Sequence, residues 1–399
     1  MGENENPKYL RVPLRAAKAA AAVLAITVAT AVVLMWPDGV DAEIGAGFAS
    51  KTEKATVEGV ERGPCPPPQP GQCVSADVRL ESGSDEGSTV SILLGDEGLA
   101  PDLSVGDSIR VFEGATADPS SAGPATGPGV YTFADFERRM PLGLLALAFV
   151  GLVVVFGRRQ GLRSLLGLAI SLLVIVIFML PALLDRGEPL LIALVGSLAV
   201  MLITISLAHG LGPKSIAAML GTALCLLLVA GLALAAIELT HLTGLASEEA
   251  TLLNLNVTEV SLQGLLIAGM VIGALGVLDD LTVSQSSTVF ALRLANPELG
   301  FGELYRRAAL VGRDHVSATV NTLVLAYVGS SLPILLLFTS GSIGLGTVIN
   351  SELVATEIVA MLVGSIGLIA AVPLTTALAA GLAQGAAPAE IGEVHAHAR

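Results

Sequence analysis

Two adjacent aspartates inside a long apolar stretch are the feature that most constrains this chain. Asp279 and Asp280 lie in the run LLIAGMVIGALGVLDDLTVSQSSTVFAL. A carboxylate at the centre of a membrane helix costs roughly 2.5–3.5 kcal/mol on insertion scales, so such residues usually face protein or water and serve a function there. A fold for this chain must therefore surround the pair with protein or water.

The composition is typical of a multi-pass membrane protein. Hydrophobic residues make up 53% of the chain and charged residues 14%, which is far from the composition of soluble domains. The formal charge of -14 is spread over polar segments, loops and the tail, so it predicts no nucleic-acid site. The sequence contains no phosphate-binding glycine loop, and we expect no cofactor, no resident metal and no enzymatic activity.

Eight apolar runs predict about eight transmembrane helices. The first, residues 19–36, follows a basic segment, 1–18, and is interpreted as an uncleaved anchor with a cytoplasmic amino terminus; a cleaved signal peptide is the alternative. Residues 139–383 are predicted to form the main helical domain, followed by a cytoplasmic tail, 384–399. Its spans are expected near 141–157, 164–184, 190–208, 215–237, up to Arg293, 315–338 and 354–383.

A polar segment, residues 37–138, separates the first two spans. Short alternating stretches such as KATVEGV and STVSILL, bounded by turn residues, predict a β-rich extracytoplasmic domain of four or five strands. Cys65 and Cys73 flank PPPQPGQ, and a disulfide is expected between them if this domain lies outside the cytoplasm. A linker rich in Pro, Gly and Ser follows at 115–129. The domain is expected either to bind a protein partner or to act as a passive spacer.

The position of the aspartates depends on where their helix ends. If Arg293 marks the cytoplasmic edge, Asp279 and Asp280 lie near the membrane midplane; if the helix begins at Ser261, they lie near the inner surface. An arginine followed by Asn296 and a proline is a natural helix exit, so the midplane position is favoured.

Two polar stripes are predicted to meet at this depth. The first stripe is a predicted proton or cation site on the helix of the aspartates, where a spacing of three or four residues brings side chains to one face. It consists of Asp279, Asp280, Thr282, Ser284, Ser286 and Ser287. The second lies on the next span, which is the expected facing helix, and consists of His315, Ser317, Thr319, Asn321 and Thr322.

Carboxylates and hydroxyls suit protons or hard cations, whereas soft metals prefer sulfur and imidazole. Two neighbouring carboxylates do not both ionise easily in a low dielectric, so one of the pair is expected to hold a proton. This hypothesis expects Asp280 to lie away from the headgroups, on the side of Thr319 and Thr322. The alternative is a structural hydrogen-bond network between helices. Glu357 is either part of an ion pathway or an interfacial carboxylate.

Three stretches carry a resemblance to a known family: GALGVLDDLTVSQSSTVFAL (273–292), GRDHVSATVNTLVLAYVGSSLPILLLF (312–338) and GSIGLIAAVPLTTALAAG (364–381). They resemble the YibE/YibF-like family of bacterial multi-pass membrane proteins. The resemblance implies a location in the bacterial plasma membrane and places Asp280 at an intramembrane acidic position, from whose pattern Asp279 departs. A fainter similarity to the SecD/SecF branch of proton-driven RND-type proteins implies that Asp280 senses protons.

Two functional hypotheses follow. The first is a proton- or cation-coupled transporter or export-assisting protein of unknown substrate. The second is a membrane scaffold or assembly factor whose extracytoplasmic domain binds a partner. An intramembrane aspartyl protease is disfavoured, because it needs aspartates from two helices and adjacent residues on one helix point about 100° apart.

Overall fold

The computed structural model describes residues 13–37, 52–65, 71–113, 131–186, 188–256, 260–341 and 343–385. The chain divides into two compact units. The helical unit consists of Met1–Ala42 and Val154–Arg399, and the β unit consists of Glu43–Val153. The predicted linker 115–129, and most of the predicted terminal segments 1–18 and 384–399, lie outside the described residues.

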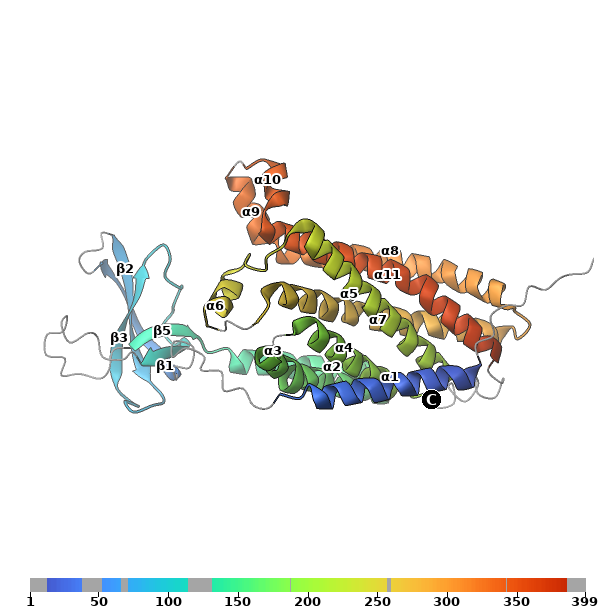
Figure 1. Cartoon of the computed structure of the whole chain (residues 1–399). Coiled ribbons are helices and arrows are strands. Elements are labelled where there is room, and N and C mark those ends of the chain that lie inside the picture. The colour runs from blue at the N-terminus through green and yellow to red at the C-terminus, as the bar shows by residue number, and fades with distance from the viewer. Residues whose placement is uncertain are drawn as a thin grey trace, which may run out of the picture. The chain divides into compact units, whose positions relative to one another are not determined.

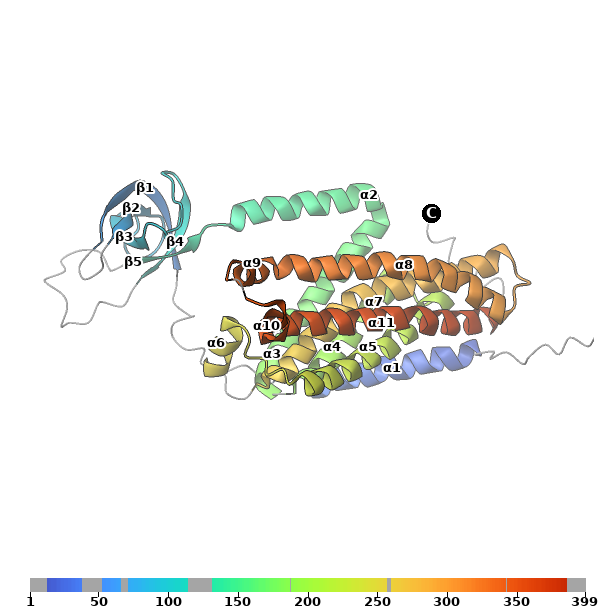
Figure 2. The same ribbon diagram turned by 90° about the horizontal axis from the view of Figure 1, so that it is seen from above.

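Long apolar helices lie side by side in the helical unit (Figure 1, Figure 2). Short helices and a π-helical turn, η1, connect some of them. The helices of the chain are α1 (Leu14–Leu34), α2 (Arg139–Val174), η1 (Ile175–Met179), α3 (Leu180–Arg186), α4 (Pro189–His209), α5 (Pro213–Thr240), α6 (Glu248–Asn256), α7 (Leu262–Ala295), α8 (Phe301–Ser330), α9 (Leu332–Ser340), α10 (Leu345–Asn350) and α11 (Glu352–Gly385).

Six helices among the described residues are long and apolar enough to cross a membrane, or up to seven if the bent pair α8 and α9 forms one span. One of the six is Arg139–Asp185, 47 residues long, where the sequence predicts two spans. Its backbone leaves the helical conformation at Arg158 (φ 48°, ψ -129°). A membrane crossing needs only about 20 residues, so the expected eight spans require this helix to cross twice, which stays a prediction.

The helix of the aspartates is longer than one span requires. Ser261 caps α7 by accepting a hydrogen bond from the Gly264 amide at 3.1 Å. At the other end α7 stops at Ala295 with Asn296 as its C-cap, and Arg293 donates to the Leu299 carbonyl at 2.6 Å. The helix end expected after Arg293 is therefore confirmed, whereas the membrane edge at this arginine stays a prediction. The 34 residues of α7 extend about 51 Å at 1.5 Å per residue. Both predicted boundaries are therefore ends of one helix, and the aspartate pair lies at its middle.

Glycines bring α5 and α11 together at the core of the helical unit. A Cβ placed on Gly367 of α11 would lie 2.3 Å from a methyl group of Val229 on α5. A Cβ placed on Gly221 of α5 would lie 2.5 Å from the hydroxyl oxygen of Thr375 on α11. Small residues at such contacts let helix backbones approach closely, which is the main way that helices gain packing energy in lipid.

The β unit contains a five-stranded antiparallel sheet in the order β3-β2-β1-β4-β5, so the predicted four or five strands are confirmed. Alternate residues of β1, such as Ala55 and Val57, are buried. The edge strands β3 and β5 are in contact, so the sheet curls around this apolar core. The strands are β1 (Thr52–Pro64), β2 (Gln72–Leu80), β3 (Thr89–Asp96), β4 (Ser108–Glu113) and β5 (Tyr131–Phe136).

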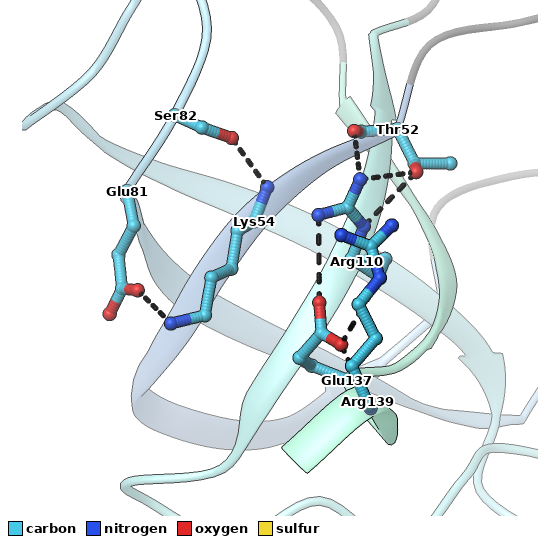
Figure 3. A network of polar contacts seen from close by, with 7 residues as sticks. All are labelled: Thr52, Lys54, Glu81, Ser82, Arg110, Glu137 and Arg139. Atoms are coloured by element: carbon cyan, nitrogen blue, oxygen red, sulfur yellow. Dashed lines mark hydrogen bonds and ion pairs between the residues drawn. The ribbon is translucent and has the colours of Figure 1, made fainter. Parts of the chain in front are cut away.

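Polar contacts and a disulfide tie the strands together. Figure 3 shows Arg110 of β4 donating to the Thr52 carbonyl at 2.5 Å and lying 3.6 Å from a carboxylate oxygen of Glu137. Nearby, the hydrogen bond from Lys54 holds the pKa of Glu81 below its usual value.

Cys65 follows β1 and Cys73 belongs to β2, the strand that pairs with it. The structure joins these two cysteines by a disulfide, with their Cα atoms 4.8 Å apart. The remaining cysteine, Cys225, is buried in α5.

Candidate functional site

A polar cavity of about 490 Å³ lies beside the two aspartates. It is bounded by α7, by α4 and by residues 163–171 of α2, all within the helical unit. Its polar lining, apart from the aspartates, comes from three helices and consists of Arg163, Ser164, Ser171, Thr204, His209 and Ser284. Ser164, Ser171, Thr204 and Ser284 lie within predicted apolar runs, whereas Arg163 and His209 lie just outside them, so the cavity extends from the apolar part of the helices to their ends.

Asp279 is half-buried and its two carboxylate oxygens have different surroundings. Oδ2 lies 3.2 Å from the hydroxyl of Thr204 on α4. Oδ1 is buried and has no hydrogen-bond partner among the described residues. A buried carboxylate oxygen without a partner is costly, and a proton or a bound cation would remove that cost.

The Thr204 hydroxyl has a choice of acceptors. Besides Asp279 it lies 2.9 Å from the Val200 carbonyl and 3.2 Å from the Met201 carbonyl of its own helix. A hydroxyl has one proton to donate. It can therefore donate to an ionised Asp279, or donate to Val200 and accept from a protonated Asp279. This geometry accommodates both protonation states of the aspartate without moving a helix.

Asp280 lines the same cavity and its side chain is exposed. His209, at the end of α4, and Arg163, on α2, line the same space. Within the described ranges, no ion pair joins Arg163 to either aspartate. No three His, Cys, Asp or Glu side chains converge there as metal ligands, in the part of the chain that the structure describes. The cavity thus offers a proton or cation two carboxylates and several hydroxyls.

The predicted stripe on α7 is divided between two neighbours. Ser284 lines the cavity together with the aspartates. Thr282 and Ser286 are fully buried against α5 instead: the Thr282 hydroxyl lies 2.6 Å from that of Thr222, and Ser286 donates to the Lys214 carbonyl at 2.7 Å.

Ser287 is half-buried and is not among the cavity-lining residues. Successive residues of a helix point about 100° apart, so a polar stripe this wide contacts two helices at once. The hydroxyls of Thr282 and Ser286 serve helix packing.

The prediction that α8 is the facing helix is wrong. Its hydroxyls bond to carbonyls of their own helix: Ser317 to Arg313, Thr319 to His315 and Thr322 to Ala318, at 2.8–3.0 Å. None of the five predicted residues lines the cavity, namely His315, Ser317, Thr319, Asn321 and Thr322. The helices α4 and α2 face the aspartates instead.

The reason lies in how α8 meets α7. Gln285 of α7 donates to the Ala308 carbonyl of α8 at 2.9 Å, and Gly312 of α8 leaves room for its side chain. Gln285 is five residues after Asp280, which places it about 140° around the helix. Packing on the Gln285 side therefore turns α8 away from the carboxylates.

Two further observations concern the sequence predictions. Glu357 lies near the start of α11, half-buried, and is not among the cavity-lining residues; its place in a pathway stays a prediction. Thr204 was missed, because the sequence does not tell which helix faces α7. Ser164 and Ser171 could have been predicted to share a polar face, because residues seven apart lie on the same side of a helix.

Comparison with known proteins gives one match. The family model described as YibE/F-like protein matches residues 145–385. That range includes every residue that lines the cavity. Neither the curated proteins nor the solved structures contain a match to the chain.

Proposed function

The chain belongs to the YibE/F-like protein family, and from this premise we propose that it is a multi-pass membrane protein coupled to protons or small hard cations. It acts as a transporter or as an export-assisting protein, and it is not an enzyme. The observation that supports this proposal is the polar cavity, which holds Asp279 and Asp280 at the middle of a 34-residue apolar helix.

Three features of the cavity favour proton or cation binding over a purely structural role. Asp279 has a buried oxygen without a partner among the described residues. Thr204 can accept from or donate to that carboxyl group. The hydroxyls that do hold helices together, such as Thr282, point elsewhere. A structural network would be expected to satisfy its own buried oxygens.

The proposed topology has about eight spans in the bacterial plasma membrane, with both termini cytoplasmic. The helix Arg139–Asp185 then crosses twice, turning at Arg158. The five-stranded sheet of the β unit lies outside the cytoplasm, where a disulfide such as Cys65–Cys73 is stable. In this arrangement the lipid bilayer surrounds the long apolar helices, including residues 139–153, and the sheet is free to bind a protein partner.

A non-transporting scaffold or assembly factor is the second candidate. The bonds from Gln285 to Thr376 and Ala308 favour it, because they join α7, α8 and α11 without any ionisable group. In that case the aspartates would be dispensable for coupling, and the β unit would provide the function.

Infrared titration of the full chain in lipid vesicles tests the proposal without knowledge of the substrate. A carboxylic acid that loses its proton shows a carbonyl band that disappears as the pH rises. We expect Asp279→Asn to remove such a band and Asp280→Asn to shift its titration. The matched control is Glu238→Gln, which replaces an exposed carboxylate at the end of α5 and should leave the band unchanged.

Flux measurements complete the test. Vesicles that contain a pH-sensitive dye report proton movement under an imposed pH gradient. Loss of movement in Asp279→Asn and Asp280→Asn, at normal abundance in the membrane, supports coupling. Unchanged infrared bands and unchanged flux in both variants would refute coupling and leave the scaffold function.

A further inference from the structure

The helices α4 and α7 run in the same direction with a fixed register. A Cβ placed on Gly264 of α7 would lie 2.9 Å from a ring carbon of Pro189 at the start of α4. Fifteen residues further along each helix, the Thr204 hydroxyl lies 3.2 Å from Oδ2 of Asp279. The spacing is equal on both helices, so residues of α4 and α7 whose numbers differ by 75 lie at the same level.

The second half of α2 runs beside α4 in the opposite direction. A Cβ placed on Gly167 of α2 would lie 3.8 Å from a methyl group of Thr204. Nearer the end of α4, the side-chain amide of Gln160 donates to the Ala208 carbonyl at 3.1 Å. The cavity therefore lies between three elements of the helical unit whose levels can be compared: α4, α7 and the continuous segment from α2 to η1.

These elements pack tightly on one side of the aspartates. A Cβ placed on Gly196 of α4 would lie 2.5 Å from Sδ of Met179 on η1. Ala193 of α4 and Ala268 of α7 are fully buried in the same apolar cluster as this methionine. Both alanines precede the contact between threonine and aspartate by eleven residues, or about 16 Å. Such a cluster offers water no polar partner, so it closes this end of the cavity.

On the other side the cavity reaches the end of a helix. His209 is the last residue of α4, is half-buried, and lines the cavity together with Ser284 of α7 and Arg163 of α2. The register of the two helices puts His209 at the level of Ser284. That level is five residues, or about 7.5 Å, beyond Asp279. His209 therefore lies between the aspartates and the open end of the cavity.

Charged groups of both signs surround this histidine. Asp280 of α7 and Lys214 of α5 interact with His209 electrostatically, and Asp279 and Arg163 line the same cavity. The carboxylates attract the positive charge of an imidazolium and the two basic groups repel it. Histidine changes its charge more readily near neutral pH than other side chains. An imidazole in these surroundings can accept a proton and release it again.

We propose that His209 carries protons between the aspartates and the side of the membrane at which α4 ends, and that this conformation exchanges protons with that side alone. Asp280 gives its proton to the His209 imidazole, and the imidazolium releases that proton to water at the helix end; proton uptake is the reverse. A polar cavity of about 490 Å³ has room for the water that completes the route. The inference rests on the proposed function.

The positions of basic residues identify the open side as the cytoplasm. Arg158 and Arg159 directly precede Gln160, which bonds to the end of α4, and Lys214 follows in the first turn of α5. Arginine and lysine are enriched in the cytoplasmic loops of membrane proteins. The aspartates therefore exchange protons with the cytoplasm, and release to the other side requires the apolar cluster to open.

A membrane-impermeant maleimide tests the sidedness on the full chain in right-side-out and inverted vesicles. The background is Cys225→Ser, with the β-unit disulfide intact. Leu211→Cys and Leu245→Cys replace exposed residues and mark the two ends of α5. Thr204→Cys lies at the level of the aspartates, and Ser197→Cys lies two turns closer to the apolar cluster, at a buried position. We expect Thr204→Cys to react only from the side that labels Leu211→Cys, and Ser197→Cys from neither side.

A second experiment separates a proton carrier from a structural residue. His209→Gln keeps a polar side chain but cannot carry a proton. It should preserve the infrared band of the aspartates and slow proton movement into vesicles at least about tenfold, whereas a positioned proton-transfer group contributes typically 10²–10⁴-fold. His209→Glu restores a titratable group and should recover part of the rate. The matched control is His241→Asn, at an exposed histidine with φ 53°, a backbone conformation that asparagine tolerates; its rate should be unchanged.

Reaction of Thr204→Cys from the Leu245 side or from neither side, or reaction of Ser197→Cys, would overturn exchange with one side. Proton movement in His209→Gln at the rate of the parent would overturn the role of the histidine. Loss of the aspartate band in both His209 variants would do the same, because it indicates a structural role. A parent chain with neither the band nor proton movement would refute the proposed function and this inference with it, so the two failures are distinguishable.

Discussion

Replacing Gly221 by alanine should weaken the packing of α5 on α11. The added Cβ would lie 2.5 Å from Oγ1, 3.2 Å from Cβ and 3.3 Å from Cγ2 of Thr375. Ordinary contacts between non-bonded carbon atoms lie at about 3.5–4.0 Å. Thr375 is fully buried and β-branched, so it has few ways to turn aside. The backbones of α5 and α11 must therefore separate.

The magnitude comes from comparison with a second glycine of the same helix. Gly231 is exposed and a Cβ there would meet nothing within 4 Å. Both substitutions gain about 0.5–1 kcal/mol of helix stability from replacing glycine by alanine. This gain cancels in the difference between the two variants. What remains is the cost of overpacking, about 1–3 kcal/mol, by which Gly221→Ala should be less stable than Gly231→Ala.

Unfolding in mixed micelles by a denaturing detergent measures this difference. Trp36 is the single tryptophan of the chain and its ring stacks on Phe178 with the centroids 5.9 Å apart, so its fluorescence reports the folded state. The double variant Gly221→Ala with Thr375→Ala should recover part of the loss, because it removes two of the three close atoms. Equal stability of Gly221→Ala and Gly231→Ala would refute the close approach of α5 and α11.

Three further predictions concern other parts of the chain. Burial raises the pKa of Tyr131 to about 12, whereas the unfolded chain loses this proton near pH 10. The free energy of unfolding should therefore fall as the pH rises from about 10 to 12. Tyr131→Phe should remove that fall in an alkaline unfolding titration. Gln285→Leu removes the donor to the Thr376 hydroxyl and should cost about 1–3 kcal/mol in detergent-induced unfolding, whereas an unchanged unfolding curve would contradict the bond. Replacing Cys65 and Cys73 together by serine opens a loop with a sequence separation of 8 and should cost about 2–3 kcal/mol of β-unit stability, measured by thermal unfolding of the full chain with the reduced parent as control.

The helices and strands were largely predictable from the sequence. A helix occupies each predicted apolar run, and the exit of α7 follows Arg293. Four strands of the β unit, β1 to β4, lie where alternating residues indicated them, whereas β5 follows the predicted linker and was not indicated. Both outcomes have a local cause. A backbone in an apolar environment must satisfy its own hydrogen bonds, and a sheet with one buried face needs alternating residues.

The candidate site was only half predictable. The sequence alone identified the costly carboxylates Asp279 and Asp280 and the hydroxyl of Ser284 beside them. It could not show that Thr204 faces them and that Thr319 does not, because the apolar surfaces of the helices are similar in composition and do not indicate which helix packs against which. That choice depends on side-chain fit between helices, such as Gln285 against Gly312. The sequence by itself determined which residues lie in helices, and that one apolar helix contains carboxylates that must face protein or water. The tertiary structure decided which side chains surround these carboxylates, because the rotation of each helix is set by packing against its neighbours.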